Sequence, residues 1–270
     1  MAAGGKKAVV IIPFYKESLS LFDGIALQQC FKVLSAYDII AIKPESLILP
    51  ETVTQYKFAG IVSFGDKYFE SVEAYNQLML SEIFYGEFLD YEFMLIYQLD
   101  AFAFRDELTY WCDQGFDYIG APWIRKKEYP TLIKRWFAKA RQQFYRRYNV
   151  KKHGYASKKQ FDDAVGNGGF SLRRVKLFYD LCISNKAKIE EYNKHYTIKF
   201  NEDAFWAIEL NRKKEVLKIP GYKEAIKFAI ELYPERGLKM NNGNLPFGCH
   251  AWDLSVDFWR PVFKELGYDI

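Results

Sequence analysis

The sequence has few cysteines and lacks several common ligand-binding motifs. Its four cysteines, Cys30, Cys112, Cys182 and Cys249, lie far apart and form no CxxC pair. Neither a structural zinc site nor a disulfide framework is therefore indicated, and we expect a reducing, cytoplasmic location. The chain contains neither GxGxxG nor GxxxxGK(S/T), which removes the main support for a dinucleotide-binding or P-loop protein.

Long hydrophobic runs and a strong net charge are also absent. No run approaches the roughly 18 apolar residues that span a bilayer. The stretch after Lys6 and Lys7 faintly resembles a signal peptide, but it is short and has no small-residue cleavage site, so we expect a first strand there. A net charge of +4 is too small to imply a nucleic-acid partner. What is abundant is hydrophobic (50%) and aromatic (18%) residues, which excludes a disordered chain.

Apolar runs alternate with amphipathic segments through the first hundred residues. Strands are predicted at 8–13, 39–42, 59–64 and 94–97. Between them, Ser20 can cap one helix, and a long helix is expected from Ser71, with Val72, Tyr75, Met79 and Ile83 on its inner side. This alternation predicts an α/β fold with a mostly parallel central sheet flanked by helices.

The segment 91–104, YEFMLIYQLDAFAF, contains the first candidate for a functional residue. Its apolar run suits a strand buried on both faces, and Asp100 follows that run directly. A carboxylate in such surroundings costs free energy unless a charged or hydrogen-bonding group meets it. Because ligands bind at the carboxyl ends of strands in open α/β sheets, a metal ion or a sugar hydroxyl is the expected partner. The alternative is an Asp that closes a turn.

Two further motifs carry candidate side chains or backbone. In GNGGFSLR, Gly168 and Gly169 permit close approach of the backbone to a ligand, or else a tight turn that enters a strand. In NEDAFW, Glu202 and Asp203 place two carboxylates ahead of an apolar helix. An N-cap role for Asn201, with acids in the first turn, explains that pattern without chemistry.

Residues 125–159 differ in composition from the rest of the chain. They contain 13 Lys and Arg and one acidic residue, a balance of +12, whereas the remainder carries −8. A helix is predicted here, with Ile133, Phe137, Phe144 and Tyr148 along one side. It could be a solvated basic helix that packs on the domain by its aromatic side. It also fits the description of an interfacial membrane segment, or of a nucleic-acid contact.

The order of these motifs resembles the GT-A class of nucleotide-sugar glycosyltransferases, and more closely a family of GT-A-like proteins known only as a domain of unknown function. The shared blocks are YQLDAFAF, DYIGAPW, GNGGFSLR, NEDAFW and FGCHAW, from about residue 90 to 252. The resemblance implies a single GT-A-like domain over 1–270. Its nucleotide-binding half would end near residue 104, and its acceptor half, 105–270, would carry the basic helical insertion 125–159.

The resemblance also implies a divalent-metal site. The Asp-x-Asp motif of GT-A enzymes appears here as Gln98-Leu99-Asp100, which keeps the second Asp, the usual metal contact. Gln98 stands at the first position and can still hydrogen-bond a ribose or water. His250, in FGCHAW, would be the late ligand, although a lone His is more often structural. Oxygen plus imidazole ligands suit Mn²⁺ or Mg²⁺ bound also to a diphosphate.

The remaining implied roles concern the two substrates. Asp203 would be the general base and Glu202 a sugar-hydroxyl contact, or the reverse. Gly168 and Gly169 would approach the donor or acceptor sugar. Nucleotide-sugar contacts would also include Pro13, Phe14, Tyr15, Lys43, Glu45, Tyr75 and Leu99, and acceptor contacts would be Trp123, Trp206 and Trp252.

The expected function is therefore that of a hexosyltransferase-like enzyme of EC 2.4. It would move a sugar from a nucleotide-diphosphate sugar, with UDP-sugars favoured, to a glycan or lipid-linked acceptor in polysaccharide biosynthesis, with inversion. We expect peripheral attachment to the inner face of the membrane through residues 125–159. We do not expect a nucleic-acid partner. The alternatives are a non-catalytic carbohydrate-binding protein and a nucleic-acid binder that uses the basic segment.

Overall fold

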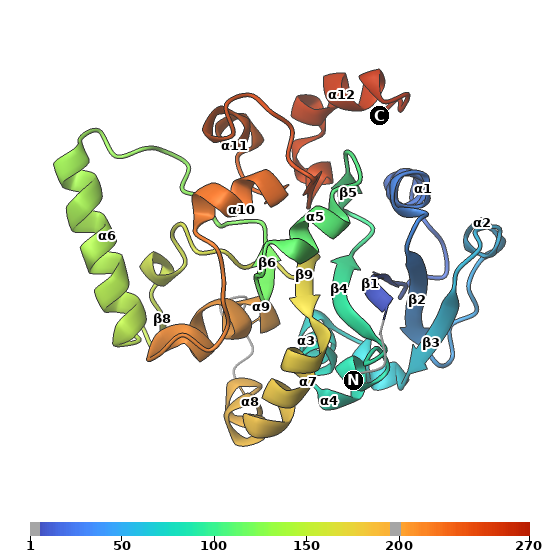
Figure 1. Cartoon of the computed structure of the whole chain (residues 1–270), viewed down its shortest axis with the longest axis horizontal. Coiled ribbons are helices and arrows are strands. Elements are labelled where there is room, and N and C mark those ends of the chain that lie inside the picture. The colour runs from blue at the N-terminus through green and yellow to red at the C-terminus, as the bar shows by residue number, and fades with distance from the viewer. Residues whose placement is uncertain (1–5, 195–200) are drawn as a thin grey trace.

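The centre of the molecule is a six-stranded sheet with the order β3-β2-β1-β4-β9-β6 (Figure 1). The computed structural model describes residues 6–194 and 201–270. The strands are β1 (Lys6–Pro13), β2 (Asp38–Pro44), β3 (Gly60–Phe64), β4 (Tyr91–Tyr97), β6 (Tyr118–Gly120) and β9 (Phe170–Arg174). The pairs β1–β2, β1–β4 and β2–β3 are parallel, whereas β9 runs antiparallel to β4 and β6. The predicted mostly parallel sheet is confirmed, and it joins strands from both expected halves.

The two central strands are apolar from Ala8 in β1 and from Phe93 in β4 onward because helices cover both faces of the sheet there. β1 and β4 pair in the register Val10 to Leu95, and both side chains are fully buried. One face packs against α1 (Leu21–Leu34), α5 (Leu108–Asp113) and α10 (Tyr222–Phe228). The other packs against α3 (Val72–Met79), α4 (Glu82–Gly86) and α7 (Val175–Ser184).

Of the two helices predicted in the first hundred residues, one is confirmed and the other is not a single helix. Ser20 caps α1 in a reciprocal capping box with Asp23, as the sequence predicts. The single long helix expected from Ser71 is wrong, because Ser81 interrupts it and caps the separate helix α4. Ile83, which follows the break, is 53% exposed, and Val72, in the first turn of α3, is 63% exposed. Their predicted inward positions are therefore also wrong.

A second, three-stranded sheet brings three distant segments together. It consists of β5 (Phe102–Ala103), β10 (Ala229–Ile230) and β11 (Gly248–Cys249), in the order β10-β11-β5. Phe102 packs with Trp252, Trp259 and Phe263 beneath α12 (Val256–Glu265). Residues that directly follow β4, β10 and β11 are thereby placed near one another.

The basic segment forms α6 (Leu132–Arg147), which stands at one edge of the molecule (Figure 1). The predicted helix is confirmed, with Thr131 as its N-cap. Of the alternatives left open for this helix, packing on the domain by its aromatic side is not found: within α6 only Ala138 is buried, whereas Ile133, Phe137 and Phe144 are 55–69% exposed. The remaining elements are α2 (Glu51–Thr54), β7 (Lys151–Lys152), β8 (Tyr155–Ala156), α8 (Lys186–Tyr192), α9 (Glu202–Ala204) and α11 (Pro234–Met240). Within the described ranges no helix is both long and apolar enough to cross a membrane.

Candidate active site

Asp100 lies on a tight turn at the carboxyl end of β4. The turn is fixed at its base because the Gln98 amide donates to the Gly169 carbonyl (2.8 Å) and the Ala101 amide donates to the Gln98 carbonyl (2.9 Å). The Asp100 side chain remains 39% exposed. A carboxylate is thus held at the sheet edge while one side stays open to a ligand.

His250 meets Asp100 from the segment that follows β11. Its Nε2 atom lies 3.1 Å from Asp100 Oδ1 and 3.3 Å from Gln98 Oε1, and its Nδ1 atom lies 3.6 Å from Glu231 Oε1. Burial lowers the pKa of His250, but hydrogen bonds and charges from Asp100 and Glu231 outweigh it and raise the pKa to about 10. Burial raises the pKa of Asp100, yet the hydrogen bond and charge of His250 leave it below its ordinary value. The two predicted ligands therefore lie in direct contact.

The contact between Asp100 and His250 also fits a divalent cation. A carboxylate oxygen and an imidazole nitrogen are donors that Mn²⁺ or Mg²⁺ accepts, and here they are adjacent, with Asp100 partly exposed. In the part of the chain that the structure describes, no three His, Cys, Asp or Glu side chains converge on one metal position. A cation here would take two protein ligands and complete its shell with substrate oxygens or water.

Gly168 and Gly169 are required by close packing. Neither has a positive φ, so a special turn conformation does not explain them. A Cβ atom on Gly169 would lie 1.9 Å from His250 Nε2 and 2.5 Å from Gln98 Oε1, and one on Gly168 would lie 2.2 Å from Glu202 Oε1. The close approach seen here is between this backbone and site side chains, and Gly169 leads directly into β9, as the alternative of a turn that enters a strand expects; approach of the backbone to a ligand stays a prediction.

Asn167 ties this backbone to His250. Its Oδ1 atom accepts hydrogen bonds from the amides of Gly169 (3.1 Å) and Phe170 (3.2 Å). Its Nδ2 atom lies 3.0 Å from His250 Nδ1. Because Asn167 is buried, these bonds hold the imidazole ring in position.

Glu202 forms a buried ion pair beneath Gly168. Arg173 Nη2 lies 2.9 Å from Glu202 Oε1, and the Arg173 side chain has no exposed surface. Arg173 also donates to Tyr85 Oη (2.9 Å) and to Ser171 Oγ (3.1 Å). Burial raises the pKa of Glu202, although the charge and hydrogen bond of Arg173 oppose this. Glu202 is therefore committed to Arg173, which favours Asp203 over it as a base.

Asp203 is half-buried beside two other acids. Burial and the charges of Glu202 and Glu231 raise the pKa of Asp203 well above its ordinary value. Its Oδ1 atom accepts a hydrogen bond from the Ala204 amide (2.6 Å). The helix-cap alternative is confirmed in part: Asn201 is the N-cap residue of α9 and both acids lie in its first turn, but the Asn201 side chain makes no cap bond and accepts instead from Asn76 (3.2 Å).

Two expected nucleotide contacts lie beside Gln98 and Asp100. Tyr15 is 57% exposed after β1; burial raises its pKa, the Lys16 charge lowers it, and the Asp100 charge raises it. The Tyr75 hydroxyl is buried without a hydrogen-bond partner of normal geometry within the described ranges. Burial raises the pKa of Tyr75, and the charge of Arg173 and the nearby Gln98 side chain only partly oppose this. Tyr15, Tyr75, Gln98 and Asp100 thus form one neighbourhood.

The other nucleotide contacts implied by the resemblance lie elsewhere or inside the core. Phe14 is 1% exposed and packs edge-on against Phe58, so its assignment as a nucleobase contact is wrong for this structure. Pro13 is also buried, and Leu99 packs against the core. Lys43 donates to the carbonyls of Pro44 (3.0 Å) and of Glu45 (3.3 Å). No contact joins Lys43 or Glu45 to Asp100 in residues 6–194 and 201–270.

The tryptophans expected at the acceptor site are mainly core residues. Trp206 and Trp252 have no exposed surface, so neither offers a ring face to a sugar, and these two assignments are wrong. The reason is apolar packing: Trp206 lies against Phe178, and Trp252 lies against Phe263. Trp123 is half-buried and packs on Phe161.

Three residues of the site were not identified from the sequence. Glu231 follows the buried strand β10 just as Asp100 follows β4, so the same signal marks both. Asn167 stands inside the GNGG motif, where its three neighbouring glycines give the stronger sequence signal. Arg173 lies on β9 among apolar residues, a placement that requires a buried acid as its partner.

Two solved structures are similar in fold. Core-mannan synthase A of Aspergillus fumigatus, in a Mn/GDP form, has a TM-score of 0.51 and 10% identity, over 83% of this chain and 74% of that one. Galactosyltransferase LgtC, in complex with donor and acceptor sugar analogs, has a TM-score of 0.51 and 12% identity, over 90% of this chain and 86% of that one. The GT-A fold predicted from the sequence is confirmed by these likenesses.

A comparison with curated proteins finds no match. A family profile, however, matches residues 58–250, which is more than half of the chain and includes Asp100, the GNGG motif, Asp203 and His250. The chain belongs to the family described as protein of unknown function, DUF5672.

Proposed function

We propose that this site transfers a sugar from a nucleoside-diphosphate sugar to a hydroxyl of a glycan or lipid-linked acceptor, with a divalent cation and inversion of the anomeric centre. The observation that carries the proposal is the 3.1 Å contact of Asp100 with His250 at the carboxyl end of β4, with Asp203 in the same acidic neighbourhood. Support comes from the shared fold, since the similar proteins include a Mn/GDP form and a complex with donor and acceptor sugar analogs.

Asp100 and His250 are the residues that would hold Mn²⁺ or Mg²⁺. When bound, such a cation acts as a Lewis acid that stabilises charge on the departing diphosphate. Gln98 would bond the ribose or a water, and the exposed Tyr15 would contact the nucleobase. Asn167 and the Arg173–Glu202 pair would position His250 and the Gly168–Gly169 backbone beneath the donor.

Asp203 would accept the proton of the acceptor hydroxyl as the glycosidic bond forms. A general base is most effective when its pKa lies near the working pH, and burial with neighbouring acids moves Asp203 in that direction. A direct displacement by that hydroxyl inverts the anomeric centre. Glu202 is less suited to the role because Arg173 holds its Oε1 atom.

The test begins with a screen of UDP- and GDP-sugars for slow hydrolysis in the presence of Mn²⁺. With the best donor, Asp203→Asn should lower kcat by roughly 10²–10⁴-fold and leave donor affinity little changed. Glu202→Gln is the matched control and should act mainly on stability. Sugar binding without turnover of any donor would contradict the proposal and favour a carbohydrate-binding protein. A larger kcat loss in Glu202→Gln would exchange the two roles.

We further propose that α6 attaches the enzyme to an anionic membrane surface, where lipid-linked acceptors lie. Ile133, Phe137, Phe144 and Tyr148 are each at least 55% exposed. They lie on one side of a segment whose net charge is +12, the description of an interfacial helix. Each Lys or Arg near such a surface contributes about 1 kcal/mol.

Vesicle flotation separates this attachment from plain solvation. Phe137→Ser with Phe144→Ser should weaken binding to phosphatidylserine vesicles, and neutral phosphatidylcholine vesicles should bind the wild type poorly. The control is Tyr110→Ser with Leu254→Ser. Both residues are also exposed, one aromatic and one apolar, but they lie outside α6. Equal binding to both vesicle types, or an unchanged α6 variant, would contradict the attachment.

A further inference from the structure

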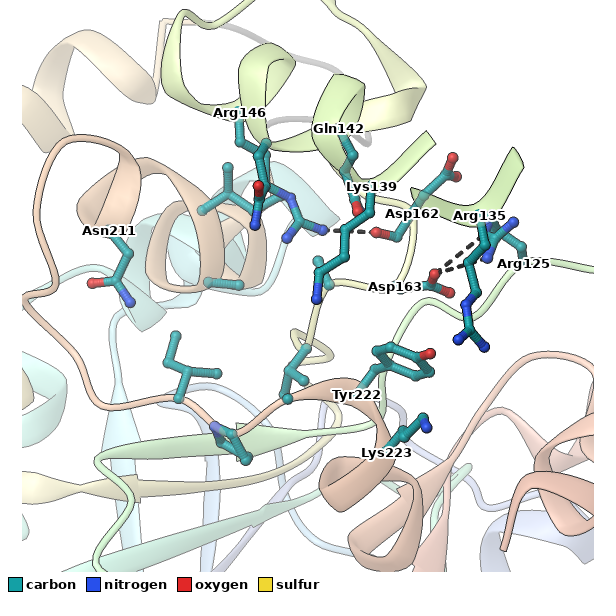
Figure 2. Close-up of a pocket in the computed structure, with 18 of the residues that line it drawn as sticks. Arg125, Arg135, Lys139, Gln142, Arg146, Asp162, Asp163, Asn211, Tyr222 and Lys223 are labelled. Atoms are coloured by element: carbon teal, nitrogen blue, oxygen red, sulfur yellow. Dashed lines mark hydrogen bonds and ion pairs between the residues drawn. The ribbon is translucent and has the colours of Figure 1, made fainter. Parts of the chain in front are cut away.

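A large cavity separates α6 from the rest of the molecule (Figure 2). Its volume is about 1120 Å³. One wall is α6, and the others come from the segments 162–165, 207–212 and 219–223. The cavity is distinct from the neighbourhood of Asp100 and His250, neither of which lines it.

The walls of this cavity are strongly basic. Seven Lys and Arg side chains line it, against two acids, Asp162 and Asp163. Its basic residues are Arg125, Arg135, Lys139, Arg146, Arg147, Arg212 and Lys223. Like charges this close repel one another unless an anion lies among them.

Some of these cations already have protein partners. Arg125 pairs with Asp163 (3.1 Å), and Arg212 pairs with Glu209 (2.7 Å). Arg146 is half-buried and donates to the carbonyl of Asp162 (2.7 Å) without an ion pair to any described residue. Burial lowers the pKa of Arg146 to about 10 despite the charges of Asp163 and Asp162. The two cavity acids therefore do not neutralise the basic set.

Arg147, like Arg146, has no ion pair among the described residues and donates to a backbone carbonyl, that of Lys213. The other three cations, Arg135, Lys139 and Lys223, have neither an ion pair nor a side-chain hydrogen bond within the described ranges. Figure 2 shows Arg135 and Lys139 reaching from α6 into the cavity, toward the end of α10 that carries Tyr222 and Lys223. The planar fork of an arginine and the point charge of a lysine together suit a phosphate group.

The orientation of α6 strengthens this interpretation. A surface helix ordinarily turns its apolar face toward the protein and its charges toward water. Here the side of α6 that forms the cavity wall carries Arg135, Lys139 and Arg146 together with Leu132 and Trp136, whereas Ile133 and Phe137 do not line it. Apolar packing does not explain three cations on the inward side of the helix, but an anionic ligand in the cavity does.

The cavity adjoins the segments that build the candidate active site. Val165 lines it and is two residues from Asn167, and Ala207 lines it four residues after Asp203. These two segments touch, since a Cβ atom on Gly166 would lie 2.6 Å from that of Ala207. A substrate anchored in the cavity is thus held against the backbone that carries the proposed base.

We propose that this cavity binds a phosphate or diphosphate group of the acceptor. That the ligand is the acceptor substrate rests on the proposed transferase function. Phosphate binding at Arg135, Lys139 and Lys223 does not depend on that function. The phosphate can belong to a lipid headgroup or to a soluble phosphorylated glycan. Both present the same anionic oxygens to the cavity.

The test is isothermal titration of inorganic pyrophosphate in EDTA, without donor. Arg135→Glu with Lys139→Glu changes the cavity wall, and Lys134→Glu with Arg141→Glu is the matched control. The control changes the net charge equally on the same helix but lies outside the cavity lining. The cavity variant should lose at least about tenfold in affinity, since it removes two cations that would make charge-assisted hydrogen bonds to the phosphate oxygens. The control should lose less than about threefold.

Equal losses of pyrophosphate affinity in both variants would overturn the proposal, because general electrostatic attraction would then explain binding. Absence of pyrophosphate binding to the wild type would also overturn it. Lys223→Glu, on the opposite wall, should reproduce the cavity loss and guards against a local defect in α6. Binding to vesicles that contain phosphatidic acid distinguishes the two sources. If the cavity variant loses more vesicle binding than the control variant, the phosphate is borne by a lipid; if the control variant loses more, the phosphate belongs to a soluble glycan. Pyrophosphate binding by a protein inactive with every donor would keep this proposal and reject the transferase.

Discussion

Gly169 gives the sharpest mutational test of how the site is packed. In Gly169→Ala the new Cβ atom would lie 1.9 Å from His250 Nε2, where ordinary contacts begin at 3.4 Å. The imidazole ring must therefore move by about 1.5 Å, or the backbone must shift by a similar amount. Either movement breaks the 3.1 Å contact between His250 and Asp100.

The expected cost of Gly169→Ala follows from that displacement. Overpacking a well-filled site costs about 1–3 kcal/mol, which for a chain of this size lowers Tm by roughly 2–12 °C. Misplacing a site group by about 1 Å can reduce turnover about 100-fold. Differential scanning calorimetry and donor turnover measure the two effects. We expect both to change together.

Gly24→Ala is the control for this experiment. A Cβ atom on Gly24, inside α1, meets no atom within 4 Å, so the change should stabilise the helix by up to about 1 kcal/mol. In a His250→Ala background, the penalty of Gly169→Ala should shrink, because the nearest colliding ring is gone. Wild-type stability and turnover in Gly169→Ala, or an undiminished penalty in the double variant, would refute this account of the packing.

The remaining predictions concern the charges around the site. Arg173→Met should lower the unfolding free energy by about 3–5 kcal/mol, because it leaves Glu202 buried and uncompensated. Adding Glu202→Leu should recover much of that loss. If urea unfolding shows that the two losses simply add, the buried pair is not the cause. In EDTA, the stabilisation from the raised pKa of His250 is fully present below pH 6.5 and lost as the pH rises toward about 10. The groups that face His250 are Asp100 and Glu231, with the neutral Gln98 and Asn167. His250→Gln should therefore flatten this alkaline fall in the unfolding free energy, and an unchanged slope would contradict it.

Much of the fold could be predicted from the sequence because periodicity records which faces are buried. Residues 8–13 of β1 and 93–97 of β4 form continuous apolar runs since both of their faces are covered, and Ser20 marks the start of α1 through its capping box. The break at Ser81 was missed because the apolar spacing continues across it. The orientation of α6 stayed open at the sequence level because periodicity identifies two faces without saying which one meets the protein.

The candidate site was predictable only in part, because its members converge through tertiary structure. Asp100 stands out locally as a carboxylate after a buried strand, whereas its contact with His250 depends on the pairing of β5 with β11. The tryptophans illustrate the opposite error. Aromatic residues suit both sugars and cores, and composition does not distinguish an exposed ring from Trp206 or Trp252, which have no exposed surface.

The most direct test of the central claim is a crystal structure with a nucleoside diphosphate and Mn²⁺, in which the anomalous signal locates the metal. The account predicts one Mn²⁺ peak within about 2.0–2.6 Å of both Asp100 Oδ1 and His250 Nε2, with the diphosphate completing its shell. It also predicts that Asp100→Ala removes that peak while the fold remains intact. A nucleotide bound away from Asp100 and His250, or full transferase activity in EDTA, would contradict the account.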